Sequence, residues 1–189
     1  MLKNKILQYA CEKHKLMAFR TEKEEWGETI VGHVKEINKD NITIGEVDEY
    51  GIPIGTSTFK LDAILDIILE DKTLNSLEIL EGLHAQLVQK DCTTFWGCGN
   101  EIKEHISERM HEKKPTTIFV NDGDNDDTDI IGFILEMDEK CILVEMIDRY
   151  GEKDGVILIP LETITGVRWD SLEDNARWLL FQRKKTCKG

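Results

Sequence analysis

Apolar residues recur along the chain with the period of a helix in some segments and the period of a strand in others. Two segments place their apolar residues on one helical face. The residues of these two faces are Leu2, Ile6 and Tyr9, and then Ile102, Ile106 and Met110. Each helix is followed by five short alternating or apolar runs, which predict strands near 16–21, 29–38, 41–48, 57–64 and 65–69 and again from 116 onwards. The pattern predicts a mainly β protein with short helices, of the α+β class.

The chain repeats itself with a spacing of 100 residues. From Ile30 to Ile67, an ungapped match to the residues 100 positions later keeps ten identities. The match holds the apolar positions in register and extends back to Leu2 and Ile102. We therefore expect two tandem copies of one fold, residues 1–88 and 101–189, joined by a linker at 89–100.

Glycine and helix-capping residues predict where the elements of each copy turn, bend or end. The motif Asp-x-Tyr-Gly at 48–51 recurs at 148–151 and ends a predicted strand. Gly51 should supply a positive φ in the turn that follows. Gly32 and Gly132 fall inside a strand, where glycine commonly marks a sharp bend. An amphipathic helix is predicted over 76–88, and Ser171 and Asp174 have the spacing of a capping box.

Two longer stretches carry a family resemblance. "GHVKEINKDNITI" at 32–44 and "GFILEMDEKCILV" at 132–144 both follow glycine with an apolar strand, a turn and a second apolar strand. With the rhythm of "KLDAILDII" and "PLETITGVR", this pattern resembles the Sm-like family, and within it the bacterial Hfq branch. The resemblance implies two tandem five-stranded Sm-like barrels, each with an N-terminal helix, and a link to RNA binding.

The chain departs from that family where the family binds RNA. Hfq-type proteins carry a Lys-His pair at the end of strand four, and the matching positions here hold Asp62 and Glu162, each preceded by leucine. Carboxylates at these positions repel phosphate. The family's turn aspartate is kept as Asp138 but is Asn38 in the first copy. We therefore expect the barrel without this RNA site.

Charge favours a protein partner. The chain has 37 acidic and 24 basic residues, a net charge of −13 and a pI near 4.8. Such a balance disfavours phosphate backbones and suits a basic protein. We expect a non-enzymatic binding or adaptor protein with a regulatory or immunity-type role. The alternatives are an RNA-binding regulator that uses Lys35, Lys39, Lys60 and the basic tail, and a structural tandem that fills two places in a ring.

The candidate binding residues are acidic. They are Asp122, Asp124, Asp126, Asp127 and Asp129 in a polar hairpin loop, with Asp62 and Glu162 at the strand-four positions. The loop begins with the one-three-five spacing of a calcium-binding EF-hand, but its sixth position is Asp127 and its twelfth is Phe133, where Gly and Glu are needed. We therefore expect a solvated hairpin without a metal.

Cysteine spacing and the absence of a catalytic pattern complete the expectations. Cys92 and Cys98 are six residues apart, whereas zinc sites usually hold closer pairs such as Cys-x-x-Cys. His84 or His105 would have to complete a zinc site here. No nucleophile, phosphate loop or cofactor motif is present. The five scattered cysteines, the charged N-terminus and the lack of a long apolar run predict a cytoplasmic protein that does not span a membrane.

Overall fold

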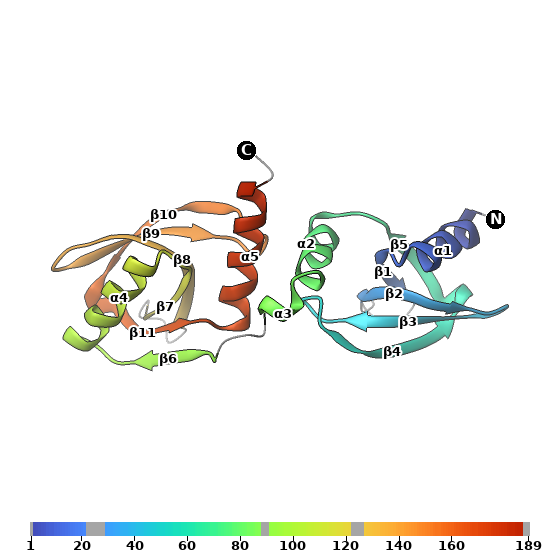
Figure 1. Cartoon of the computed structure of the whole chain (residues 1–189). Helices are drawn as coiled ribbons and strands as arrows, with labels where there is room; N and C mark the ends of the chain where they lie inside the picture. Colours follow the sequence, from blue (N-terminus) through green and yellow to red (C-terminus); the bar gives the residue numbers. More distant parts are fainter. Residues whose placement is uncertain (1, 22–28, 88–90, 122–126, 187–189) are drawn as a thin grey trace. The chain divides into compact units, whose positions relative to one another are not determined.

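The computed structural model describes residues 2–21, 29–87, 91–121 and 127–186 (Figure 1). For Asp127 and Thr186 it describes the backbone alone. The chain divides into two compact units, Met1–His84 and Ala85–Gly189. Each unit has its own antiparallel sheet, helices and core. The predicted mainly β protein of the α+β class is confirmed.

The first unit is built on a five-stranded sheet. Its elements are α1 (Leu2–Lys13), β1 (Leu16–Thr21), β2 (Thr29–Ile37), β3 (Asn41–Val47), β4 (Pro53–Lys60), the 3₁₀ turn η1 (Leu61–Ala63), β5 (Ile64–Ile68) and α2 (Lys72–Glu81). The strands lie in the order β4-β3-β2-β1-β5. The helix predicted over 76–88 is instead divided, because α2 ends before Gly82 and a separate short helix α3 (His84–Leu87) follows. Glycine costs a helix interior about 1 kcal/mol relative to alanine, which accounts for the break.

The second unit has a six-stranded sheet. Its elements are β6 (Thr93–Trp96), α4 (Asn100–Glu112), β7 (Thr116–Asn121), β8 (Asp127–Met137), β9 (Cys141–Ile147), β10 (Lys153–Pro160), η2 (Leu161–Thr163), β11 (Ile164–Trp169) and α5 (Leu172–Thr186). The strands lie in the order β10-β9-β8-β7-β11-β6. The stretch 89–100, which we expected to be a linker, therefore contains a strand. β6 belongs to the second sheet because it pairs with β11.

The β2–β3 pair of the first unit and the β8–β9 pair of the second have the same register, although β1 and β7 are offset from each other by one residue, with Leu16 opposite His33 but Thr116 opposite Gly132. Gly32 faces Glu46 across β2 and β3, and Gly132 faces Met146 across β8 and β9. Both ladders shift register two residues further on. A Cβ added at Gly32 would lie 2.2 Å from the carbonyl oxygen of Gly45, and the equivalent distance in the second unit is 2.3 Å. Glycine is therefore required at both positions because the neighbouring strand passes too close for a side chain.

The closed five-stranded barrel predicted for each copy is not formed by hydrogen-bonded strands. In the described part of the chain, β4 and β5 lie at opposite edges of the first sheet, and β10 and β6 lie at opposite edges of the second. The turns η1 and η2 carry the chain away from β4 and β10, so that β5 pairs with β1 and β11 pairs with β7 instead. Among the described residues, each sheet therefore has two edge strands that are hydrogen-bonded on one side only.

The repeated Asp-x-Tyr-Gly motif forms a tight turn in both units. One carboxylate oxygen of Asp48 accepts hydrogen bonds from the N–H groups of Tyr50 and Ile52, at 2.9 and 2.8 Å. Asp148 accepts the same two bonds in the second unit at the same distances. Gly51 has a φ of 77°, and its counterpart has a φ of 70°. The predicted positive φ is confirmed, and the aspartate explains why the motif recurs as a whole.

Helices cover both faces of the first sheet. Met17 and Phe19 of β1 point into a core that includes Leu7 of α1. Leu16 and Ala18 point to the other side, into a cluster with α2. β1 is therefore apolar at every position from 16 to 19, which is the pattern of a strand buried on both faces.

The second unit fastens its last helix with a polar cluster. Asp174 of α5 is 2% exposed. Its carboxylate accepts hydrogen bonds from the hydroxyl of Thr117 at 2.7 Å and from the hydroxyl and N–H of Ser171 at 2.6 and 3.1 Å. The N–H of Asp174 donates to the Ser171 hydroxyl at 3.1 Å. The predicted capping box is confirmed, and it also ties α5 to β7.

Two aspartates should give the stability of the protein opposite dependences on pH. Burial raises the pKa of Asp174 despite its hydrogen bonds. The folded state therefore binds this proton first, and the contribution of Asp174 to stability grows as the pH falls through the raised pKa. Backbone N–H groups of Lys140 and Cys141 lower the pKa of Asp138. Its contribution is present above pH 4 and is lost as the pH falls through the lowered pKa.

Urea unfolding between pH 7 and pH 3 tests this. The stability of the wild type relative to Asp174→Asn should rise as the pH falls, and its stability relative to Asp138→Asn should fall. The same sign for both variants would contradict the assignment.

Candidate binding groove in the second unit

The acidic residues singled out in the sequence are not brought together by the described structure. Asp62 and Glu162 are exposed in the 3₁₀ turns of different units, and Asp129 is exposed on β8. Asp127 begins β8, and its side chain lies outside the described residues. Asp122, Asp124 and Asp126 also lie outside them. The expected acidic binding surface stays a prediction.

The described residues contain no group of three or more His, Cys, Asp or Glu that could hold a metal. Cys92 and Cys98 are exposed on either side of β6. His105, a possible zinc partner in the sequence, packs its ring against Phe95 with the centroids 4.5 Å apart. In the described part of the chain this histidine therefore serves as a packing residue.

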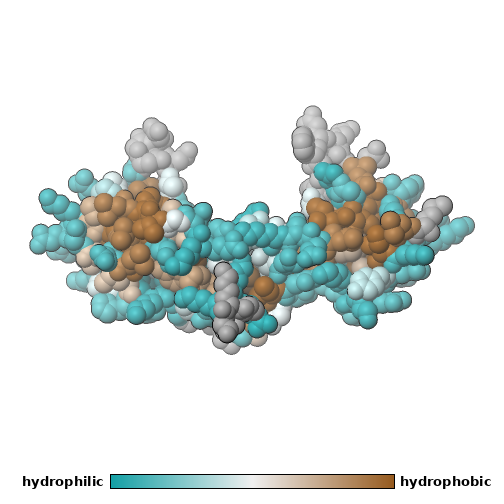
Figure 2. Space-filling view, turned by 90° about the horizontal axis from the view of Figure 1, so that it is seen from above, coloured by the Kyte–Doolittle hydropathy of each residue, from teal (hydrophilic) through white to brown (hydrophobic). Residues whose placement is uncertain are grey.

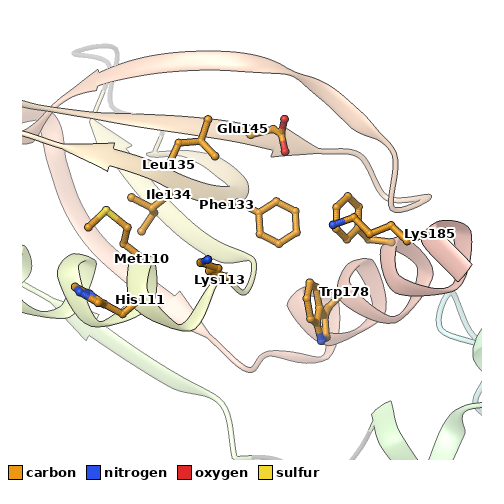
Figure 3. A pocket seen from close by; sticks show the side chains of 10 residues that line it. Met110, His111, Lys113, Phe133, Ile134, Leu135, Glu145, Trp178 and Lys185 are labelled. Carbon is orange, nitrogen blue, oxygen red and sulfur yellow. The ribbon is translucent and has the colours of Figure 1, made fainter.

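The second unit contains a groove of about 590 Å³ between the end of α4, the middle of β8 and the outer part of α5 (Figure 3). Its side chains are mostly apolar. The lining residues are Met110, His111, Lys113, Phe133, Ile134, Leu135, Glu145, Trp178, Phe181 and Lys185. A groove of this size and composition suits one or two side chains of a bound molecule.

Three aromatic rings form one end of the groove. The ring of Phe133 lies 4.8 Å from that of Phe181 and 5.9 Å from that of Trp178. The Trp178 and Phe181 rings are 6.1 Å apart and close to parallel. Phe133 and Phe181 are buried with Ile131, and Trp178 is only partly buried. These three rings form the aromatic floor at this end of the groove, and a ligand can contact the partly buried ring of Trp178.

The charges at the groove are mainly positive, although the protein as a whole is acidic. The Lys185 ammonium lies 4.4 Å from the centroid of the Phe181 ring. Lys113 follows α4 in a left-handed conformation with a φ of 54°. Glu145 is neutralised by Lys153 at 2.5 Å, whereas no ion pair to another described residue holds Lys113 or Lys185. The groove therefore offers two cations to a ligand.

Apolar surface continues from the groove across the outer face of the sheet. Leu135 of β8 is 44% exposed, and Val156 and Leu158 of the edge strand β10 are 56% and 62% exposed. Figure 2 shows apolar surface gathered on this unit, the left-hand one in that view. The groove and this face together form the apolar surface, defined here by Leu135, Val156, Leu158 and Trp178.

The first unit places hydrogen-bonded and ion-paired polar side chains at the equivalent positions. His33 stands where the second unit has Phe133, and its Nε2 lies 2.9 Å from Glu81, which replaces Phe181. Glu78 replaces Trp178 and pairs with Lys15 at 2.9 Å, which raises the pKa of that lysine. The aromatic floor is therefore a property of the second unit, and the shared fold does not require it.

The outer face of the first sheet is polar as well. Lys35 replaces Leu135, and its side chain lies over Gly45. Thr56 and Thr58 replace Val156 and Leu158, and the Thr58 hydroxyl is hydrogen-bonded to that of Thr43 at 2.9 Å. One fold thus carries a polar face in one copy and an apolar face in the other.

The sequence analysis missed this surface, but a signal for it is present. The identities between the two copies reveal the duplication, but this surface lies at positions where the copies differ. Positions 35, 56, 58 and 78 are polar in the first copy, whereas the residues 100 positions later are apolar or aromatic. Exposed apolar residues at positions that tolerate polar ones favour a binding surface over a packing requirement.

The chain matches no protein-family model, no curated protein and no solved structure. None of the described helices is long and apolar enough to span a membrane.

Proposed function

We propose that this is a non-enzymatic binding protein, built from two Sm-like copies, that holds a protein partner on the apolar surface of its second unit. The observation that carries the proposal is the difference between the copies. The first unit has the His33–Glu81 pair at the equivalent positions, whereas the second leaves an aromatic floor and exposed leucines. Exposed apolar residues promote aggregation, and a role in binding explains why the second unit has them.

The groove also defines the chemistry of the partner. Its apolar floor suits a segment with large apolar or aromatic side chains. Lys113 and Lys185 at the groove suit carboxylates next to those side chains. We therefore propose an apolar, acidic segment of a protein as the ligand of the groove. A basic partner, proposed from the charge of −13, would have to use the acidic surface elsewhere.

RNA is the less favoured ligand. Of the lysines suggested for it, Lys35 is laid along Gly45, and Lys39 and Lys60 are exposed. In the basic tail, Lys184 pairs with Glu152 at 2.8 Å. We propose the cytoplasm as the location, because Cys11, Cys92, Cys98 and Cys141 are all unpaired thiols.

A peptide selection tests the proposed function. Phage that display random 12-residue peptides would be selected on the full-length protein, and the enriched peptides would be synthesised and titrated. The test variant Leu135→Lys, Val156→Thr, Leu158→Thr carries the residues of the first copy at three exposed positions, so it should fold. We expect peptides rich in apolar and acidic residues to lose at least about tenfold in affinity for the variant.

Ile54→Thr is the matched control, because Ile54 is 62% exposed but lies on the first unit. It should leave the affinities unchanged. Enriched peptides that bind the triple variant and the wild type equally well would refute the apolar surface as the binding site. Short mixed RNAs that bind at micromolar concentration, with affinity that falls steeply with salt, would favour the RNA alternative.

A further inference from the structure

In the second unit, β6 covers the outer edge of β11. The two strands are antiparallel, with Phe95 opposite Val167. The N–H of Gly97 extends this pairing and donates to the carbonyl of Thr165 at 3.0 Å. β11 therefore has hydrogen-bonded neighbours on both sides, β7 and β6.

β6 also covers apolar surface. Phe95 packs against the core beside α4. Trp96 lies across Gly166, where an added Cβ would be 2.6 Å from the indole ring. The ring of Trp96 is also 4.5 Å from that of Phe119. The edge of β11 and the strand that covers it are thus fitted to each other by shape.

The first unit has the same edge without the covering strand. β5 corresponds to β11, and in the described part of the chain it pairs with β1 alone. Apolar side chains of β5 and of the residue that follows it are exposed: Leu65 is 58% exposed, Ile68 is 37% exposed and Leu69 is 42% exposed. Figure 2 shows apolar surface on this unit too, the right-hand one in that view.

We propose that the outer edge of β5 is a second binding site, which takes an extended segment of a partner protein as an antiparallel strand. The pairing of β6 with β11 is the template for this complex. It places an apolar or aromatic side chain of the partner opposite Ile67, where Phe95 lies in the second unit. That side chain would cover the exposed Leu69 that follows β5. Strand addition of this kind satisfies the backbone groups of a free edge.

The next position of the partner strand must differ from β6. Asp66 stands where the second unit has Gly166, and it is paired with Arg20. Its side chain takes the space that Trp96 uses in the second unit. A cavity of about 230 Å³ lies here, lined by Arg20, Asp66, Ile67, Ile68 and Thr29. We therefore expect a small polar side chain, which can bond the carboxylate or the guanidinium, in place of tryptophan.

A peptide derived from β6 tests the proposal. It has the sequence of residues 91–98 with serine in place of Cys92, Trp96 and Cys98, and a fluorophore at its N-terminus. Titrated with the full-length protein to about 1 mM, it should bind and increase the polarisation of the fluorophore. The same peptide with serine also in place of Phe95 should bind at least about tenfold more weakly, because the anchoring ring is absent.

Two variants locate the binding. Leu69→Lys changes an exposed residue directly after β5 and should weaken the binding of the peptide at least about tenfold. Ile54→Lys makes the same kind of change on β4, at the opposite edge of the same sheet, and should leave the affinity unchanged. Hydrogen exchange should show new protection of β5 amides when the peptide is bound, and no change at β11.

Three results would overturn the proposal. The first is equal binding of the peptide to both variants, or no binding at 1 mM. The second is loss of protection in β6 and β11, which would mean that the peptide displaces the native strand. The third is a self-associated wild-type protein that Leu69→Lys converts to monomers in sedimentation, because the edge would then belong to a second copy of the chain. None of these depends on the groove of the second unit, so the two sites are tested separately.

Discussion

Gly32→Ala should lower the free energy of unfolding of the first unit by about 3 kcal/mol, the upper part of the range for overpacking. The reason is the close approach of β2 to β3. A Cβ at this position would lie 2.2 Å from the carbonyl oxygen of Gly45 and 2.7 Å from a methyl carbon of Ile44. The backbone oxygen cannot move without separating the two strands. Urea unfolding followed by far-UV circular dichroism measures the loss.

Gly82→Ala is the control for this prediction, because it makes the same change in the same unit. Gly82 has a φ of −66°, and an added Cβ would meet its nearest neighbour, the carbonyl oxygen of Ile79, at 3.5 Å. The substitution should be neutral or should stabilise the unit by about 0.5 to 1 kcal/mol, since alanine restricts the unfolded chain. Equal destabilisation by both substitutions would show that the strands do not require glycine at position 32.

Asp174→Ala should lower the free energy of unfolding of the second unit by about 3 kcal/mol, because it removes a helix cap and leaves a buried hydroxyl without an acceptor. The carboxylate accepts from the hydroxyl of Thr117 at 2.7 Å, in a site where Asp174 is 2% exposed. It also accepts from the N–H and hydroxyl of Ser171. Chemical denaturation followed by tryptophan fluorescence measures the change.

A double-mutant cycle separates the two causes. Thr117→Val removes the hydroxyl that Asp174 accepts from, so the alanine substitution should cost less in the Thr117→Val background than in the wild type. A coupling energy of zero would contradict the tie between β7 and α5 and would leave the capping box as the whole effect. Glu162→Ala changes an exposed carboxylate of the same unit and should have no measurable effect.

The local structure was predictable where short-range chemistry decides it. The turn glycine and the capping box depend on neighbours within a few residues, and the duplication can be read directly by comparing the two halves of the sequence. The strand β6 was missed because "TTFW" is only four residues long and becomes a strand through its pairing with β11, about 70 positions away. Non-local pairing of this kind leaves little trace in a short segment.

The apolar surface of the second unit was not predictable from the pattern of one copy alone. "VILI" at 156–159 is continuously apolar, which is the pattern of a strand buried on both faces. In the structure it lies on the edge strand β10, so that Ile159 is buried but Val156 and Leu158 are exposed. The sequence shows which residues are apolar, but the position of a strand within its sheet decides which of these residues stay exposed.

The polar cluster around Asp174 has a further consequence for how the chain reaches its native state. Tandem domains of similar sequence are prone to misfold by exchanging equivalent elements during synthesis. If α2 entered the second unit, Leu74 would replace Asp174, and the buried Thr117 hydroxyl would lose its hydrogen-bond acceptor. If α5 entered the first, its carboxylate would be buried against Leu16 and Ala18, which offer no hydroxyl in place of that of Thr117. This mismatch penalises the swapped product in both directions and keeps each helix with the sheet made in the same half of the chain.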